Sequence, residues 1–364
     1  MKKILIIGNS LSAWSVASAF INQKVNITII GNKNNTFGAQ QLSPNGLRAL
    51  KKLIQNDDVK NIVYEIIKFQ INSYNNNETR MLKNFYFNEF DLKYFSVSRE
   101  MLINFLIKNV KNNIQINEIN KSCVGIIQRE PGKLEVLMDN KEFISADIII
   151  GCDGVNGITR KYVCGTTNIV KKKVFRGISD DKNKLLLEQK TLELNFSNYG
   201  HFVSYPFINN NKTFINYVFI PNRLFQNSNE ILDKLKSISK FSQIDWNDGH
   251  FYFYEDEIQT IHKDNVLLFG DAGFSFEPHL AQVGNNIIED ASYLKFLVEN
   301  TNSYVEIFEN ISRNTCKKKR KLKSISNIVG ITFGISTFTK LRDSLVSNFS
   351  DQFMCDFLKK VWYD

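Results

Sequence analysis

Asn265–Ala291 reads NVLLFGDAGFSFEPHLAQVGNNIIEDA, and this stretch decides the fold. It opens with the apolar run Val266–Phe269, whose length is typical of a fully buried strand. Gly270 and Asp271 end that strand, a loop follows, and an apolar pair then leads into a helix. A strand, a glycine turn and a helix start bring backbone N–H groups to one point, which suits phosphate or another electron-rich ligand.

The same order of elements is predicted at the first residues of the chain. Ile4–Ile7 is a continuous apolar run, and Gly8 follows it. Ser10 and Ala13 stand at the next two positions of the dinucleotide-binding glycine pattern, and a helix is expected from Trp14. Both side chains are small enough for a pyrophosphate to approach the backbone. Taken alone, this motif leaves an ordinary strand–helix turn as an equal alternative.

A second strand, Val25–Ile30, completes a βαβ unit. In dinucleotide-binding proteins an acidic residue at the end of this strand binds the adenosine ribose. Here the position holds Gly31, followed by Asn32. Asn32 can still bond a ribose hydroxyl, although more weakly than a carboxylate.

A third strand and turn are predicted at 148–158. The buried strand is Ile148–Ile150, and Asp153 and Gly154 follow it before a helix that carries Arg160. A carboxylate between glycines after a buried strand can contact a ribose hydroxyl. The alternative is an aspartate that caps the next helix in a tight turn.

Two arginines are candidates for phosphate binding. Arg48 lies on a predicted helix beyond the turn at 43–46, and Arg99 opens a helix that Ser98 is expected to cap. An arginine in the first helical turn opposes the helix dipole, so a partner elsewhere is expected for Arg99. For both residues a solvated surface arginine remains the alternative.

Composition excludes several classes of protein. A chain of 364 residues with 43% hydrophobic and 23% charged residues can build a sizeable core. The five cysteines show no paired spacing, so neither a disulfide framework nor a metal site is expected. The apolar run after Lys2 and Lys3 is too short for a signal peptide, and we expect a cytoplasmic protein. We attribute the net charge of +9 mainly to the overall composition of the chain and not to a binding patch. No nucleic-acid partner is expected.

Changes in the sequence pattern divide the chain into four parts. We expect a first domain built from 1–168, with a small strand insertion at 61–97, and from 255–300. Alternating aromatic segments predict an antiparallel-sheet domain at 169–254. The remainder, 301–364, is helical in pattern and contains a basic run at 317–323. Two interpretations of this part stay open, a helical cap over the second domain and an amphipathic surface that contacts anionic lipid.

Together the three strand–turn–helix motifs resemble those of the flavoprotein aromatic hydroxylases, the FAD-dependent monooxygenases of the hydroxybenzoate, salicylate and ubiquinone-biosynthesis types. The 8–13 turn resembles the dinucleotide turn of that family, and GCDG with Arg160 resembles its second fingerprint. GDA at 270–272 resembles its GDAA motif, and PHLAQVG at 278–284 resembles its flavin loop. The resemblance implies an α/β fold with a Rossmann-like FAD-binding domain, an interleaved antiparallel-sheet substrate domain and C-terminal helices.

The resemblance also implies the site residues. The expected cofactor-binding residues are Gly8, Ser10, Leu11, Ser12, Ala13, Asn32, Arg48, Arg99, Val124, Asp153, Gly154, Gly270, Asp271, Pro278, Gln282, Gly284 and Asn285. The candidates for the catalytic pocket are His201, Tyr205, Pro206 and His279, with His279 as a proton carrier or, alternatively, a solvated loop histidine.

The implied activity is hydroxylation of an aromatic ring with FAD, O₂ and NADH or NADPH as a transient reductant. A polyprenylated phenol of ubiquinone biosynthesis is the first choice of substrate, and a small aromatic acid is the second. Association with a membrane at its inner face, or with a quinone-biosynthesis complex, is a further expectation. The alternatives are an accessory or assembly protein of that complex without turnover, and another flavoenzyme of the same fold, such as a prenyl-chain reductase.

Five departures from the family pattern motivate these alternatives. Gly31 replaces the ribose-binding acid, and Ser10 and Ala13 replace glycines. Phe274 stands where histidine is usual, and Val283 stands where the flavin loop normally has glycine. Gly284 lies one residue later and can supply the same backbone freedom.

Overall fold

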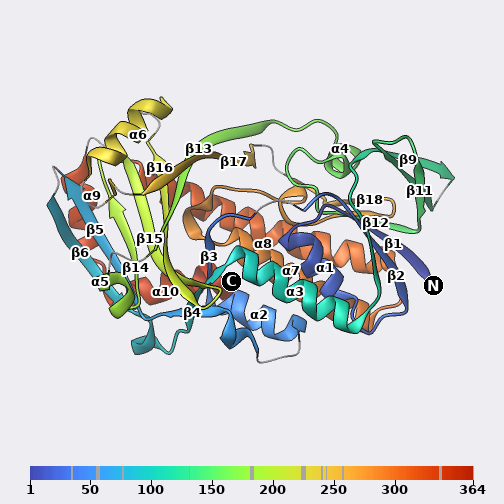
Figure 1. Cartoon of the computed structure of the whole chain (residues 1–364), viewed down its shortest axis with the longest axis horizontal. Helices are drawn as coiled ribbons and strands as arrows, with labels where there is room; N and C mark the ends of the chain where they lie inside the picture. Colours follow the sequence, from blue (N-terminus) through green and yellow to red (C-terminus); the bar gives the residue numbers. More distant parts are fainter. Residues whose placement is uncertain are drawn as a thin grey trace.

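The computed structural model describes residues 1–33, 36–54, 58–75, 78–130, 132–180, 184–222, 227–238, 241–242, 244–255, 258–335 and 338–363. Figure 1 shows two large sheets toward opposite ends of the long axis, with helices between them. The helices are α1 (Leu11–Ala19), α2 (Pro44–Ile54), α3 (Arg99–Asn113), α4 (Ile158–Cys164), α5 (Lys184–Glu188), α6 (Ser228–Ser237), α7 (Val283–Asn300), α8 (Tyr304–Phe333), α9 (Thr339–Ser347) and α10 (Asp351–Tyr363).

The first sheet is parallel apart from its edge pair. Its strand order is β18 (His262–Lys263), β19 (Val266–Leu268), β12 (Ile148–Gly151), β1 (Lys2–Ile7), β2 (Val25–Ile30) and β8 (Ile116–Ile119). The three apolar runs that the sequence singles out are therefore neighbours, with β1 between β12 and β2. Their isoleucines are buried because both faces of the sheet are covered, one by helices that include α1 and α3, and the other by the apolar side chains of the strands at 134–146 and by α4.

The second large sheet has seven strands. Its order is β17 (Asp245–Tyr254), β13 (Ile169–Asp180), β16 (Lys212–Pro221), β15 (Gly200–Asn209), β14 (Thr191–Phe196), β5 (Lys68–Asn75) and β6 (Glu78–Tyr86). All neighbours are antiparallel except β14 and β5. The last two strands come from the segment that the sequence treats as a small insertion, so this segment widens the substrate-domain sheet.

Two small sheets complete the strands. One is an antiparallel meander, in the order β11 (Phe143–Ala146), β10 (Lys133–Met138) and β9 (Cys123–Glu130). The other has the order β3 (Ala39–Leu42), β7 (Tyr94–Ser98) and β4 (Val63–Ile66). Short 3₁₀ helices are η1 (Asp58–Asn61), η2 (Phe87–Phe90), η3 (Gly270–Ala272) and η4 (Pro278–Leu280). The expected α/β architecture is confirmed, and Ser98 caps α3 by accepting a hydrogen bond from the Met101 N–H.

The basic run lies in α8, which crosses the middle of the molecule (Figure 1). Lys318 pairs with Glu289 at 2.8 Å, and the buried Lys319 pairs with Asp290 on α7. Arg320 donates to the carbonyl of Ile258 at 2.9 Å. Much of this run therefore holds α8 against neighbouring segments. Within the described ranges, no helix is long and apolar enough to cross a bilayer.

Candidate active site

Gly8 makes the turn after β1. Its φ of +114° is one that side-chain-bearing residues rarely adopt, and a Cβ there would lie 2.3 Å from the carbonyl oxygen of Cys152. Only glycine fits because that oxygen belongs to the backbone. The turn directs the chain into α1, whose first N–H groups have no partner within the helix. Ser10 and Leu11 at this helix start line a cavity.

Gly270 makes the corresponding turn after β19. It has φ +59°, and a Cβ there would lie 2.1 Å from Ser12 Oγ. The turns that follow β1 and β19 therefore meet at Ser12. Asp271 follows, and its Oδ1 is buried with no hydrogen-bond partner among the described residues. Burial raises the pKa of Asp271, and the charges of Lys319 and Arg99 and a hydrogen bond from the Ser275 side chain oppose this rise, while Oδ1 keeps no partner in the described part of the chain.

Arg160 braces the backbone of the GDA turn. It is buried and donates from Nη1 to the carbonyls of Ala272 at 2.8 Å and Gly273 at 3.2 Å. Its guanidinium also lies 3.2 Å from the ring centroid of Tyr254, whose hydroxyl donates to the carbonyl of Asp271 at 2.9 Å. These contacts fix the backbone at Asp271 and at the two residues that follow it.

Asp153 has a different role from Asp271. It accepts a hydrogen bond from the Thr159 N–H at 3.0 Å and another from the Thr159 hydroxyl, so it caps the start of α4. Burial raises the pKa of Asp153, and the bonds from Thr159 partly offset that rise. Both carboxylate oxygens have partners within the protein. Asp153 therefore caps a helix in a tight turn, which is one of the two alternatives that the sequence leaves open.

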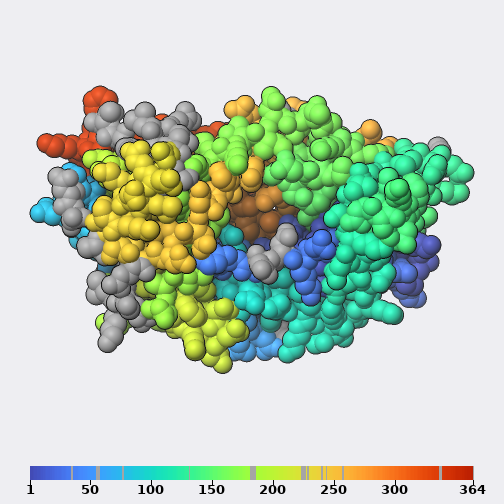
Figure 2. Space-filling view, turned by 45° about the horizontal axis from the view of Figure 1, so that its top comes forward, coloured from blue at the N-terminus to red at the C-terminus, as the bar shows by residue number. Residues whose placement is uncertain are grey.

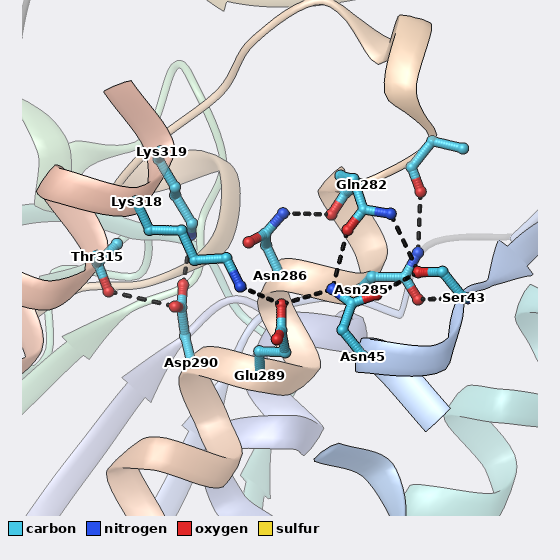
Figure 3. A network of polar contacts seen from close by, with 11 residues as sticks. Ser43, Asn45, Gln282, Asn285, Asn286, Glu289, Asp290, Thr315, Lys318 and Lys319 are labelled. Carbon is cyan, nitrogen blue, oxygen red and sulfur yellow. Dashed lines mark hydrogen bonds and ion pairs between the residues drawn. The ribbon is translucent and has the colours of Figure 1, made fainter. Parts of the chain in front are cut away.

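The loop at 278–285 is held by a buried polar network. Asn45 Nδ2 donates to Gln282 Oε1 at 3.0 Å, and Gln282 Nε2 donates to Ser43 Oγ at 3.0 Å. Asn285 Nδ2 donates to the carbonyls of Gln41 and Ala281. Figure 3 shows that Asn45 also donates to Glu289, which pairs with Lys318, and that the adjacent Asp290 on α7 pairs separately with Lys319. The amide groups of Gln282 and Asn285 thus bind the protein itself and shape the loop.

The side chain of His279 is only 5% exposed. Its Nε2 lies 2.6 Å from Glu277 Oε2, and Lys172 binds the other oxygen of Glu277. Burial raises the pKa of Glu277, but the hydrogen bonds from His279 and Lys172 outweigh it and bring the pKa to about 2. Gly330 on α8 makes room for the ring, since a Cβ there would lie 2.6 Å from it. The histidine is therefore fixed, not solvated.

With Nε2 bonded to the Glu277 carboxylate, the neutral ring of His279 carries its hydrogen on Nε2. Nδ1 is then an acceptor, and it is buried with no partner among the described residues. The ring centroid of His201 lies 5.3 Å away. Burial lowers the pKa of His201 well below its ordinary value, so this neighbour is neutral at physiological pH.

Ser10, Leu11, Asp271, His201 and His279 line one cavity of about 640 Å³. Figure 2 shows a hollow near the middle of one face, between the parts coloured blue and those coloured yellow to orange. Its walls are mostly apolar side chains of the seven-stranded sheet and of α8 to α10. Four buried polar atoms on its lining have no hydrogen-bond partner among the described residues. They are Gln40 Nε2, Asn216 Nδ2, Asp271 Oδ1 and His279 Nδ1.

The cavity brings together part of the predicted site. The predicted residues that line it are Ser10, Leu11, Arg99, His201, Tyr205, Asp271, Pro278, His279 and Gly284. The predicted residues outside its lining are Gly8, Ser12, Ala13, Asn32, Arg48, Val124, Asp153, Gly154, Pro206, Gly270, Gln282 and Asn285. Arg48 is exposed and stacks on Tyr363, while Asn32 and Val124 lie on the surface.

Sequence reasoning missed Lys172, Arg176, Asn216 and Glu277. Three of them stand on β13 and β16, where alternation predicts only which face a side chain occupies. Glu277 precedes the flavin-loop motif and has no motif position of its own. The one signal in the sequence was an arginine, Arg176, within an aromatic strand segment. Without the fold, such an arginine cannot be distinguished from a solvated one.

Comparison with solved structures gives the same architecture. A variant of HpxO from Klebsiella pneumoniae, crystallised with FAD, has a TM-score of 0.86 at 15% identity and covers 100% of this chain and 98% of its own. Salicylate hydroxylase in a substrate complex has a TM-score of 0.77 at 16% identity, over 100% of this chain and 96% of its own. The chain has the flavoprotein hydroxylase fold.

A third solved structure agrees with these two. It is 2,6-dihydroxypyridine-3-hydroxylase from Arthrobacter nicotinovorans, with a TM-score of 0.74 at 13% identity, over 90% of this chain and 93% of its own. HpxO has also been crystallised with FAD and uric acid. No family model and no curated protein matches the sequence. The resemblance that the three motifs predict is confirmed at the level of the fold.

Proposed function

We propose that this protein binds FAD along the cavity and hydroxylates a phenolic ring with O₂ and NADH or NADPH. The observation that carries the proposal is Asp271 Oδ1, a buried acceptor without a partner among the described residues, on the wall of a ligand-sized cavity. A buried carboxylate costs free energy unless it is hydrogen-bonded, so a ligand with hydroxyl groups suits this position. The ribityl chain of FAD is such a ligand.

The residues present fit the remainder of the cofactor. The start of α1, which Ser10 and Leu11 place on the cavity, offers N–H groups to the pyrophosphate. Arg99 lines the same cavity and supplies a positive charge. The loop at 278–284 would lie against the ring system, and its polar network keeps it in place. Bound FAD would supply the activation of O₂, which none of the protein's own side chains provides.

The chain's own residues account for substrate handling. The apolar walls would exclude water and hold a ring by its faces. His279 Nδ1 would accept the proton of the phenol hydroxyl, which increases the electron density of the ring at the attacked carbon. Glu277 would keep the hydrogen of the imidazole on Nε2 during this transfer. Overall, a phenol, O₂, NAD(P)H and a proton give the hydroxylated phenol, water and NAD(P)⁺.

For the substrate we retain a polyprenylated phenol of quinone biosynthesis as the first choice, since α8 to α10 extend the apolar part of the cavity. The exposed side chains Ile328, Ile331, Phe338 and Leu341 near that end support peripheral contact with the inner face of a membrane. We expect the protein to sediment with anionic liposomes, and expect replacement of Ile331 and Leu341 by serine to release it. Equal sedimentation of the two forms would contradict this part of the proposal.

Turnover is tested with ¹⁸O₂. The FAD-loaded protein is incubated with NADPH or NADH and a panel of phenols, and the products are analysed by mass spectrometry. Incorporation of a single ¹⁸O atom into one phenol, with reductant oxidation stimulated by that phenol, is the expected result. FAD uptake without phenol-dependent oxidation of reductant would instead favour the accessory protein or another flavoenzyme of this fold. The departures at Phe274 and Val283 motivate that comparison.

A further inference from the structure

Arg176 is the one charged side chain that the seven-stranded sheet contributes to the cavity lining, among the residues that the structure describes. It lies on β13, and its pairing partner on β16 is Val218, which also lines the cavity. The neighbouring positions on this face of the sheet are apolar or neutral. Side chains alternate between the two faces of a strand, and Arg176 stands on the face that lines the cavity. It is therefore not a residue of a solvent-facing side of the sheet.

The guanidinium of Arg176 has no carboxylate partner in the described part of the chain. Burial lowers the pKa of Arg176 to about 10, and the charge of Arg99 adds to that effect. The group stays cationic at neutral pH, beside a second arginine on the same cavity. Removing a charge from water without a partner is costly, so an anion between or beside these groups would be bound favourably.

Asn216 adds a donor on the same face. It pairs with Ile178, two residues beyond Arg176, and across the next strand it pairs with Tyr205. Its Oδ1 accepts a hydrogen bond from the Ala39 N–H at 3.0 Å. Nδ2 is left buried and without a partner, on the lining of the cavity. The orientation of this amide is set by Ala39, so the free end is a donor.

We propose that Arg176 and Asn216 Nδ2 bind an oxyanion of a ligand that enters this cavity. The planar guanidinium suits a carboxylate or a phosphate, and the amide adds a second donor. Two sources have this chemistry, the carboxylate of an aromatic acid substrate and a phosphate of the nucleotide cofactor. The choice of source rests on the proposed function, whereas anion binding itself does not require turnover.

The test measures binding by calorimetry with four probes. They are 4-hydroxybenzoate, its neutral match 4-hydroxybenzamide, inorganic pyrophosphate and FAD. We expect Arg176→Gln to weaken binding of one class of anion about 10- to 100-fold while the neutral amide is unaffected. Arg176→Lys should restore part of the affinity. Arg129→Gln is the control, since Arg129 is exposed on β9 and its loss changes the net charge equally.

Asn216→Asp provides a second variant that retains the arginine. It keeps an acceptor for the Ala39 N–H and replaces the free donor with a carboxylate oxygen, which should repel the anion and pair with Arg176. Loss of 4-hydroxybenzoate alone assigns the site to a substrate carboxylate, and loss of pyrophosphate and FAD assigns it to the cofactor. Equal affinity of the wild-type protein and both variants for all three anions would overturn the proposal. Arg176-dependent anion binding without any FAD uptake would instead refute the proposed function, but it would support the anion site.

Discussion

Replacement of Asp271 by alanine is expected to weaken FAD binding about 10- to 100-fold, because hydrogen bonds to a charged group contribute about 1.5–3 kcal/mol. The free Oδ1 of this carboxylate is the acceptor that the cofactor's hydroxyl groups would use. The measurement is a titration of the cofactor-free protein with FAD, followed by the quenching of flavin fluorescence. Unchanged affinity would mean that the cofactor lies elsewhere.

Asp153 offers a matched control for this experiment. Its oxygens already accept hydrogen bonds from Thr159, so Asp153→Ala should lower stability by about 1 kcal/mol through loss of the cap, with little effect on FAD binding. The two aspartates follow equivalent strands in the sequence, but the structure separates their roles. An equal loss of FAD affinity in both variants would contradict this distinction.

Removal of the Asp271 charge should weaken FAD binding, but it should not lower the thermal stability of the cofactor-free protein. The pKa of Asp271 is raised in the folded protein, so the folded state holds the proton more tightly than the unfolded state does. Its contribution to stability is thus lost as pH rises above 3.8 through the folded-state pKa, and ionised Asp271 destabilises the cofactor-free protein at neutral pH. We expect Asp271→Asn to unfold at the same or a higher temperature at pH 7. A large decrease would indicate a structural role.

His279→Gln is expected to reduce turnover about 10²- to 10⁴-fold at neutral pH, which is the range for loss of a general base. The glutamine amide can still donate to Glu277, as Nε2 does now, but it offers no acceptor at the position of Nδ1. FAD binding should be near that of the wild-type protein. The measurement is kcat with the phenol that best stimulates reductant oxidation, as a function of pH.

Activity of the His279 variant should recover as pH approaches the pKa of the phenol in water, because the substrate then arrives already ionised. His262→Gln is the control, since His262 lies on β18 and is outside the cavity lining. A variant whose activity is reduced equally at every pH would show that His279 shapes the site without accepting a proton.

Local sequence patterns were sufficient to predict β1, β2, β12 and β19 of the cofactor half and the turns after β1, β12 and β19, but they did not predict β8 or β18. Gly8 is required by a backbone contact and Gly270 by its positive φ beside the Ser12 side chain, and such turn positions leave a visible glycine. The roles of Gln282 and Asn285 could not be read in this way, because their partners at 41–45 and 281–282 are set by tertiary packing. The basic run similarly looks like a charged surface until α7 supplies Glu289 and Asp290.

The substrate half depends even more on long-range pairing. The strands at 68–86 extend the sheet of 169–254 through the parallel pair β14 and β5, which no local pattern indicates. Arg176, Asn216 and Tyr205 come from three strands and meet only through their register. Periodicity gives the face of each side chain but not the neighbour across the strand, so the chemistry of this wall becomes visible only in the fold.

The central claim is that this chain holds FAD, and the most direct measurement is the visible spectrum of the purified protein during titration with FAD. We expect a yellow protein that saturates at one FAD per chain, with an absorption band that is shifted and structured relative to free flavin. A protein that stays colourless after removal of excess FAD, at every concentration of added cofactor, would contradict the account.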